Sequence, residues 1–428
     1  MKIQIVGLAT FDQMAGGSAR YLTGLSEGLR RLGHRVEVHT SAGYVATRGY
    51  TETGIVGQLR RTAKRFLVYM PKTFVAVLGA RPDIVNSHFA LDGLPAVLAA
   101  ALIRRPVIVN FQGPWAQEAV ATGRRGGWPL STHARRLVER LVYCHARRCI
   151  ALSRAFADIL VEEYGVAPAR VRVIPGGLDT ARFAGLPKAP EARRRLGLEE
   201  RYTLITVRRL VPRMGLELAI DALADITTTR DAQLIVAGVG PERDHLEQHA
   251  RARGVSNRLR FLGRVDDAEL PLVYAAGDVC VVPSRELEGF GYTALEALAA
   301  GTPVIAAGTG GLVELVGALE PRWVVSRDGR SIAEAINRLA SERHEYPDPD
   351  ACRRYARTMD WAVVLPRVVA VFHEAGARAG RLRIGQAFGV ADREILDAAI
   401  GVIDEPGEPA RARSVSADPT DDGRQVDR

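Results

Sequence analysis

Two glutamates, Glu288 and Glu296, are separated by seven residues in the stretch SRELEGFGYTALEALAAGTPVIAA. A carboxylate accepts several hydrogen bonds, so a pair that does not hydrolyse a bond can instead hold the hydroxyl groups of a sugar. Gly289 and Gly291 flank Phe290 and have no Cβ, which lets the backbone pass close to a ligand. The pattern therefore predicts a polar binding site rather than a buried turn.

The elements around this stretch predict a strand, a loop, a helix and a second strand. An apolar run before Pro283 is typical of a buried strand, and residues 303–307 form another. Between them we expect a helix from Tyr292 to Ala300, because Gly301 is a good stop signal. Its first amides, around Tyr292 and Thr293, have no acceptor within the helix and favour an anion.

This stretch resembles the donor-site signature of the retaining family 4 glycosyltransferases. The resemblance includes the two glutamates and the motifs FG, GTPVI and GG that follow Glu288. It implies the GT-B fold, in which two Rossmann-like, doubly wound α/β domains face a cleft and a C-terminal helix crosses back to the first domain. It extends over about residues 1–375 and is most specific between residues 204 and 316.

In that family one glutamate holds the ribose hydroxyls and the other holds the donor sugar, so the resemblance implies these roles for Glu296 and Glu288. The family pattern G-R-L-x-x-x-K-G places a cation against the donor diphosphate, and Arg209 matches its arginine. Met214 stands where lysine is expected. We therefore expect Arg213, one residue earlier, to supply the second cation beside the leaving diphosphate.

The resemblance also implies a glycine loop before the first helix, a G-x-G-P turn and a strand beside the nucleobase. Arg208 departs from the family pattern, because glycine is expected at its position. The predicted catalytic residues are Glu288, Arg209 and Arg213. The predicted donor-binding residues are Gly16, Gly17, Arg209, Arg213, Gly238, Arg264, Glu288, Gly289, Phe290, Gly291, Tyr292, Thr293 and Glu296.

Three residues of the first half are candidates for the acceptor side. His88 follows a predicted strand, and Gln112 precedes Trp115 in the sequence FQGPW. Many members of the family carry histidine at the position of Gln112. Glutamine donates and accepts hydrogen bonds but does not titrate, which argues against a general base at this position.

Composition and charge agree with an α/β enzyme and limit the other classes. The 428 residues are enough for two or three domains. The net charge of +9 comes mainly from scattered arginines, without the aromatic interleaving of a nucleic-acid surface, so no nucleic-acid partner is expected. Four cysteines without zinc spacing indicate reduced thiols and a cytoplasmic protein. No cofactor is expected, and no metal.

The domain boundaries follow from composition. We expect an acceptor-side domain over residues 1–178, a nucleotide-sugar-binding domain over 179–350 and crossing-back helices over 351–375. Residues 404–428 are polar and rich in proline, which is typical of a disordered tail. Basic and apolar residues alternate around residues 59–72, so peripheral contact with an anionic membrane is one alternative to a solvated face.

The resemblance predicts a retaining hexosyltransferase that uses a nucleoside diphosphate sugar, with uridine slightly favoured over guanosine as the base. The acceptor is a hydroxyl group of a small molecule, a glycan or a lipid. Two alternatives remain open at this point. One is a protein of the same fold that binds nucleotide sugars without transferring them, and the other is an epimerase of the same fold.

Overall fold

The structure is a computed structural model that describes residues 1–8, 16–41, 65–121, 132–228 and 231–376. The tail predicted at residues 404–428 lies outside the described residues, as do Arg60, Arg61 and Lys64 of the basic segment. Each half of the described chain is built on one six-stranded sheet, and both sheets are parallel throughout. The predicted GT-B architecture is confirmed.

The first sheet has the strand order β2-β1-β3-β4-β5-β6. In its centre Ile5 of β1 pairs with Val38 of β2 and with Asn86 of β3. The strands are β1 (Lys2–Gly7), β2 (Arg35–Thr40), β3 (Ile84–Ser87), β4 (Val107–Phe111), β5 (Arg148–Ala151) and β6 (Val171–Val173). Their near-continuous apolar runs are typical of strands covered on both faces.

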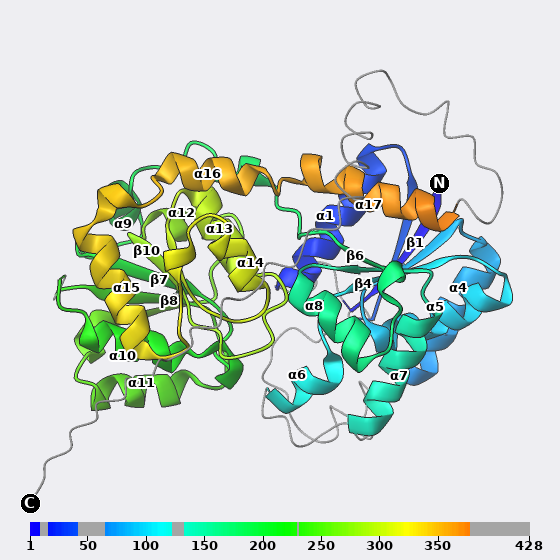
Figure 1. Ribbon diagram of the computed structural model, residues 1–428, viewed down its shortest axis with the longest axis horizontal. Helices are drawn as coiled ribbons and strands as arrows, with labels where there is room; N and C mark the ends of the chain where they lie inside the picture. The colour runs from blue at the N-terminus through cyan, green and yellow to red at the C-terminus, as the bar shows by residue number, and fades with distance from the viewer. Residues whose placement is uncertain (9–15, 42–64, 122–131, 229–230, 377–428) are drawn as a thin grey trace, which may run out of the picture. The chain divides into compact units, whose positions relative to one another are not determined.

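Helices cover both faces of this sheet, with α1 and α17 on one face and α4, α5 and α7 on the other (Figure 1). The elements of this half are α1 (Gly17–Arg31), η1 (Arg65–Tyr69), α4 (Met70–Ala80), α5 (Ala90–Leu102), α6 (Trp115–Ala121), α7 (Thr132–His145), α8 (Arg154–Asp158), η2 (Ile159–Glu163) and η3 (Pro168–Arg170).

The second sheet has the order β12-β11-β10-β7-β8-β9. Chain order runs outward from the middle in both directions, so the strand order reverses between β7 and β10. In open α/β sheets ligands bind at such a switch point, beyond the carboxyl ends of the strands. The strands are β7 (Thr203–Val207), β8 (Gln233–Ala237), β9 (Leu259–Gly263), β10 (Val279–Val282), β11 (Val304–Ala307) and β12 (Val324–Val325).

The helix expected between Glu288 and the following strand is present as α13 (Tyr292–Ala300), ended by Gly301 at a φ of 87°. The other elements of this half are η4 (Thr180–Phe183), α9 (Ala189–Arg195), η5 (Pro212–Met214), α10 (Leu216–Asp225), α11 (Arg243–Ala252), η6 (Ser256–Arg258), α12 (Leu270–Ala275), α14 (Gly311–Gly317), η7 (Pro321–Trp323), α15 (Gly329–Ser341) and η8 (Arg343–Glu345).

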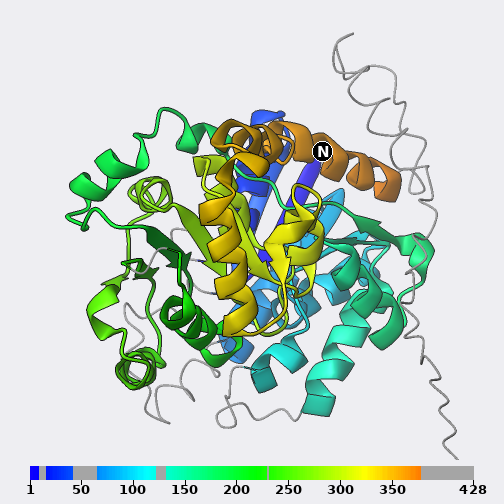
Figure 2. The same cartoon turned by 60° about the vertical axis from the view of Figure 1, so that its left-hand side comes forward.

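Two helices end the described chain. α16 (Pro349–Arg357) stays with the second sheet, where Tyr355 donates a hydrogen bond to the carbonyl of Leu315 at 2.8 Å. α17 (Trp361–Gly376) lies along α1 of the first half in both views (Figures 1 and 2). A Cβ at Gly24 would lie 2.2 Å from the Trp361 ring, so the two helices touch closely. The predicted crossing-back helix is confirmed.

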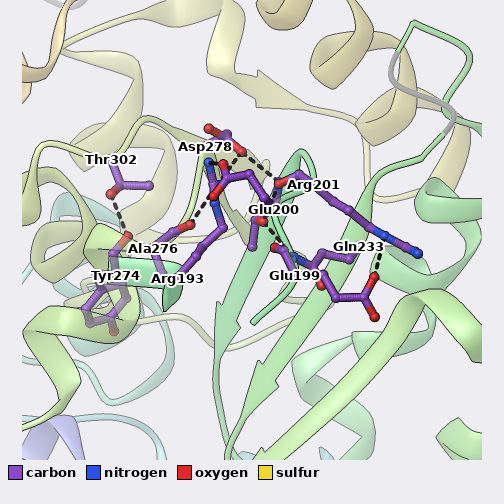
Figure 3. A network of polar contacts seen from close by, with 10 residues as sticks. Arg193, Glu199, Glu200, Arg201, Gln233, Tyr274, Ala276, Asp278 and Thr302 are labelled. Carbon is purple, nitrogen blue, oxygen red and sulfur yellow. Dashed lines mark hydrogen bonds and ion pairs between the residues drawn. The ribbon is translucent and has the colours of Figure 1, made fainter. Parts of the chain in front are cut away.

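An ion-pair network around the buried Arg193 side chain fixes α9 to the amino-terminal end of the second sheet. Figure 3 shows Arg193 directed at Asp278 and Glu200, with nitrogen-to-oxygen distances of 2.9 Å to both. Asp278 also accepts the amide of Thr203, the first residue of β7, at 2.7 Å. Ligands bind at the opposite, carboxyl-terminal end of parallel strands, so this network has a structural role.

Candidate active site

Glu288 lies in the loop between β10 and α13, where the sequence places it. Leu287 before it has a φ of 54°, a left-handed conformation that a leucine rarely adopts. The Glu288 carboxylate forms an ion pair with Arg208, and its Oε2 accepts a hydrogen bond from Ser284 Oγ at 3.0 Å. Burial alone would raise the pKa of Glu288, but Arg208 and Arg213 hold that pKa below its usual value. Glu288 is therefore a carboxylate in this site.

Glu296 lies in the second turn of α13, and its side chain is only 6% exposed. Tyr274 Oη donates to its Oε2 at 2.7 Å, and Arg20 Nε lies 3.0 Å from its Oε1. Burial raises the pKa of Glu296, and the cation of Arg20 and the bond from Tyr274 oppose that rise. Arg20 comes from α1 and Tyr274 from α12, so one carboxylate joins both halves of the chain.

Three arginines follow β7 in the sequence RRLVPR. Arg208 is buried against Glu288, whereas Arg209 is exposed. Arg213 is buried, and its Nη1 donates to the carbonyl of Leu287 at 3.2 Å. Its Nη2 lies 4.0 Å from Glu118 Oε1, which belongs to α6 of the first half. Arg213 is thus directed at the Glu288 loop.

Met214, at the position where lysine is expected, packs into the apolar core and is 7% exposed. Gly215 follows it at a φ of 66°, and a Cβ there would lie 2.1 Å from the carbonyl oxygen of Pro283. The turn therefore presses against the end of β10. This packing explains why the side chain before Gly215 is buried and the guanidinium one residue earlier faces the Glu288 loop.

The glycines and aromatic residues predicted for the donor side fall into one neighbourhood. Gly291 caps α13 at a φ of 98°, which favours glycine, and Phe290 beside it is buried. Tyr292 Oη donates to the carbonyl of Gly177 at 3.2 Å. A Cβ at Gly17 would lie 3.0 Å from the Tyr292 ring, so the glycine loop and the start of α13 are adjacent.

The remaining donor-side predictions lie at strand ends. Thr293 Oγ1 donates to the carbonyl of Val207, the last residue of β7, at 3.0 Å. A Cβ at Gly238 would lie 1.8 Å from the carbonyl oxygen of Arg208, so only glycine fits there. A Cβ at Gly289 would lie 2.4 Å from the Phe156 ring of the first half. Gly16 and Arg264 are exposed.

The acceptor-side candidates occupy the carboxyl ends of β3 and β4. His88 is buried, and its Nε2 lies 2.7 Å from Asn86 Oδ1, while Asn110 receives a hydrogen bond from Tyr21 at 3.0 Å. Because Asn86 Oδ1 can only accept, Nε2 of His88 carries the proton and Nδ1 has a free lone pair. Burial lowers the pKa of His88 to about 3, so this ring is neutral near pH 7.

Gln112 is half-buried, and its Nε2 has no hydrogen-bond partner within the described ranges. Trp115 begins α6, and its amide donates to Glu139 Oε1 at 2.7 Å. Glu139 is fully buried and also accepts hydrogen bonds from Tyr143 and Tyr164. This carboxylate therefore positions the start of α6, the helix that carries Glu118 toward Arg213.

Sequence reasoning missed five residues of the site: Arg20, Glu118, Arg208 as a partner of Glu288, Asp267 and Tyr274. Asp267 Oδ1 lies 2.7 Å from Arg20 Nη2. The only local signal was the position of Arg20, one turn after Gly16 and Gly17. The others approach from distant segments and leave no periodic pattern in the sequence.

Neither a membrane-spanning helix nor a metal-binding cluster is found among the described residues. None of their helices is long and apolar enough to cross a bilayer. No group of three or more histidine, cysteine, aspartate or glutamate side chains among them is arranged to hold a metal ion.

Comparisons with known proteins match both halves of the chain. The family model described as glycosyl transferases group 1 matches residues 188–359, and the model described as glycosyltransferase family 4 matches residues 15–182. An uncharacterized glycosyltransferase of Methanocaldococcus jannaschii is 28% identical over 89% of this chain and 100% of its own length.

Other relatives carry more specific names. A D-inositol 3-phosphate glycosyltransferase of Salinispora arenicola is 33% identical over 70% of this chain and 70% of its own length. A GDP-mannose-dependent alpha-(1-6)-phosphatidylinositol monomannoside mannosyltransferase of Mycobacterium tuberculosis is 38% identical over 45% of this chain and 52% of its own length. The crystal structure of HepE from Anabaena in complex with UDP superposes with a TM-score of 0.70 at 20% identity, over 87% of this chain and 100% of that one.

Proposed function

The chain belongs to the glycosyl transferases group 1 family and is a glycosyltransferase, and from that premise we propose that it transfers a hexosyl group from a nucleoside diphosphate sugar to a hydroxyl acceptor with retention of configuration. The observation that carries the proposal is the placement of Glu288 and Glu296 with Arg209 and Arg213. All four lie beyond the carboxyl ends of β7 and β10, where the strand order reverses.

The charges of these residues support a division of roles. Glu296 holds the ribose hydroxyls, because its Oε2, bonded to Tyr274, and its Oε1, paired with Arg20, keep further acceptor positions. Glu288 holds hydroxyls of the donor sugar. Arg209, which is exposed, and Arg213 stabilise the diphosphate as negative charge develops on it.

In the proposed reaction the bond between the sugar C1 and the diphosphate oxygen breaks, and its electron pair leaves with the diphosphate. The acceptor oxygen forms the new bond to C1 on the same face, and its proton passes to the leaving phosphate. We assign no covalent intermediate to Glu288, because Arg208 and Ser284 already engage its carboxylate. A glycosyl adduct trapped on Glu288 would contradict this assignment.

The donor is a uridine or guanosine diphosphate sugar, with uridine slightly favoured. Support for a nucleotide sugar comes from a neighbour solved with UDP and a relative named as dependent on GDP-mannose. We propose His88, Gln112 and Trp115 for the acceptor side, where Nδ1 of His88 and Nε2 of Gln112, which have no hydrogen-bond partner among the described residues, suit a hydroxyl group. No metal is needed, since guanidinium groups supply the charge, so excess EDTA should leave turnover unchanged.

We place the enzyme in the cytoplasm, since all four cysteines are free thiols.

We also propose peripheral contact with an anionic membrane through the α4 and α5 face. Leu67, Leu98 and Leu102 are exposed there, and Lys72 and Arg104 beside them are exposed cations. Co-sedimentation with anionic but not neutral vesicles, weakened in Leu67→Ser/Leu102→Ser, checks this contact; equal recovery with both lipids would contradict it.

Release of nucleoside diphosphate from a panel of uridine, guanosine, adenosine and thymidine diphosphate sugars tests the proposed function. We expect slow release from one donor and its loss in Glu288→Ala and Glu296→Ala. Arg330→Ala is the matched control, because that side chain is 84% exposed and pairs with Glu334 on its own helix. Release that survives in both glutamate variants would show that the donor site lies elsewhere.

A further inference from the structure

Arg208 occupies an unusual place for an arginine. It follows the last residue of β7, and its side chain is 4% exposed. Its Nη2 forms the ion pair with Glu288 Oε2. A cation buried this deeply is stable only when its charge and its donors are compensated.

The compensation is incomplete in the described part of the chain. Nη1 of Arg208 is buried and has no hydrogen-bond partner there, and the same holds for Nε of Arg213. An unpaired buried donor costs about 1–3 kcal/mol, so such groups in native proteins call for an explanation. A ligand with anionic oxygens, bound where both guanidinium groups approach the Glu288 loop, would satisfy both donors.

The Met214 side chain cannot bind that ligand. Met214 is packed among apolar residues and carries no charge. Arg213 is partly committed, since its Nη1 holds the Leu287 carbonyl and its Nη2 faces Glu118. Arg208 is therefore the buried guanidinium with one nitrogen engaged by Glu288 and another left for a ligand.

We propose that Arg208 is a catalytic residue that binds the donor diphosphate through Nη1 while Nη2 holds Glu288, and so supplies the cation that Met214 does not. This inference rests on the proposed transfer from a nucleoside diphosphate sugar. As the bond from C1 to the diphosphate oxygen breaks, the electron pair moves onto the diphosphate beside Arg208. The acceptor oxygen bonds to C1, and its proton goes to the leaving phosphate.

The first test measures binding and does not depend on turnover. Dissociation constants of UDP and UMP, and of GDP and GMP, are compared for the wild type, Arg208→Gln, Arg208→Lys and the control Arg330→Gln. We expect Arg208→Gln to lose most of the preference for the diphosphate, about tenfold or more, while Arg208→Lys and the control keep it. These ligands lack the donor sugar and each pair shares the same nucleoside, so a change in the ratio reports the second phosphate rather than the contact of Glu288 with a donor sugar.

The second test moves the positive charge from position 208 to position 214. With the donor found in the panel above, Arg208→Gly should lower kcat by about 100-fold, the scale for losing one charge-stabilising group. Adding Met214→Lys to Arg208→Gly should restore at least a tenth of the wild-type kcat. Melting temperatures of every variant show whether each is folded.

Several results would overturn the inference while leaving the proposed function intact. A higher kcat in Arg208→Gly would mean that Arg208 obstructs the donor site. If Arg208→Gln keeps the preference for the diphosphate and loses only turnover, Arg208 is a structural partner of Glu288 and does not bind the diphosphate.

The opposite outcome is also distinguishable. If the wild type binds nucleoside diphosphates through Arg208 but releases none from any donor sugar, the proposed transfer fails and the inference on binding stands.

Discussion

At the scale of single residues, Glu296 accepts a hydrogen bond from Tyr274 and forms an ion pair with Arg20, and the two contacts have different effects. Tyr274 fixes the orientation of the carboxylate, and Arg20 opposes the rise in pKa that burial causes. A buried carboxylate that must hold ribose hydroxyls needs both, because an unoriented or protonated group accepts fewer hydrogen bonds. The Tyr274 hydroxyl is the simpler of the two contacts to remove.

Tyr274→Phe should raise the KM for the donor about 2- to 10-fold with little change in kcat, because one hydrogen bond of about 0.5–1.5 kcal/mol is lost. Steady-state kinetics with the donor varied measure this. Tyr355→Phe is the control, since that hydroxyl also donates to a buried acceptor, the Leu315 carbonyl, away from the site. Equal effects of the two substitutions would assign the Tyr274 effect to general stability.

At the scale of elements, the site depends on how firmly β7 and β10 are held side by side. Their amino-terminal ends are joined through Asp278, which accepts the Thr203 amide and pairs with Arg193 of α9 (Figure 3). At their other ends the Arg208 and Glu288 side chains meet. The scaffold network and the candidate site thus occupy opposite ends of the same two strands.

Arg193→Ala should lower the free energy of unfolding by about 2–4 kcal/mol, because it leaves Asp278 partly buried without its cation. Urea unfolding measures this change, and turnover per folded molecule should stay near the wild-type value. Arg194→Ala is the matched control on the same helix, since that side chain is 67% exposed and pairs with Glu191 of that helix. Loss of turnover in fully folded Arg193→Ala would show that the two strand ends are coupled.

At the scale of the whole molecule, the candidate site is shared between the two sheets. Arg20 of α1 reaches both Glu296 and Asp267, and Arg213 faces Glu118 of α6. α17 packs on α1 through Trp361 and Leu365, against Gly24 and Gly28. The position of Arg20 therefore depends on the crossing-back helix as well as on its own.

Arg20→Ala should move the acid limb of kcat/KM to higher pH. The Arg20 cation favours the charged form of Glu296, so its loss raises the pKa of that carboxyl further and protonation begins at a higher pH. Arg31→Ala, 80% exposed on the same helix, should leave the profile in place. An acid limb that does not move in Arg20→Ala would show that Glu296 does not control donor binding.

Local patterns in the sequence determine the elements that carry the site. The apolar run before Pro283, the stop at Gly301 and the spacing of the two glutamates predict a strand, a loop and a helix, and α13 begins and ends where they indicate. The two doubly wound sheets are implied by the resemblance to the family. The strand, the loop and the helix depend on neighbouring residues, so periodicity and stop signals in the sequence are sufficient to find them.

The partners of each charge are decided only by the tertiary structure. Nothing local indicates that Arg208 pairs with Glu288, that Arg213 faces Glu118, or that Met214 turns into the core. These contacts join residues of different elements that lie far apart in the sequence. Arg213 and the Leu287 carbonyl are 74 positions apart, and Arg20 and Glu296 are 276 positions apart. Which side chains meet depends on the packing of two sheets and on the crossing-back helix, and a linear pattern does not encode that packing because each segment is compatible with many neighbours.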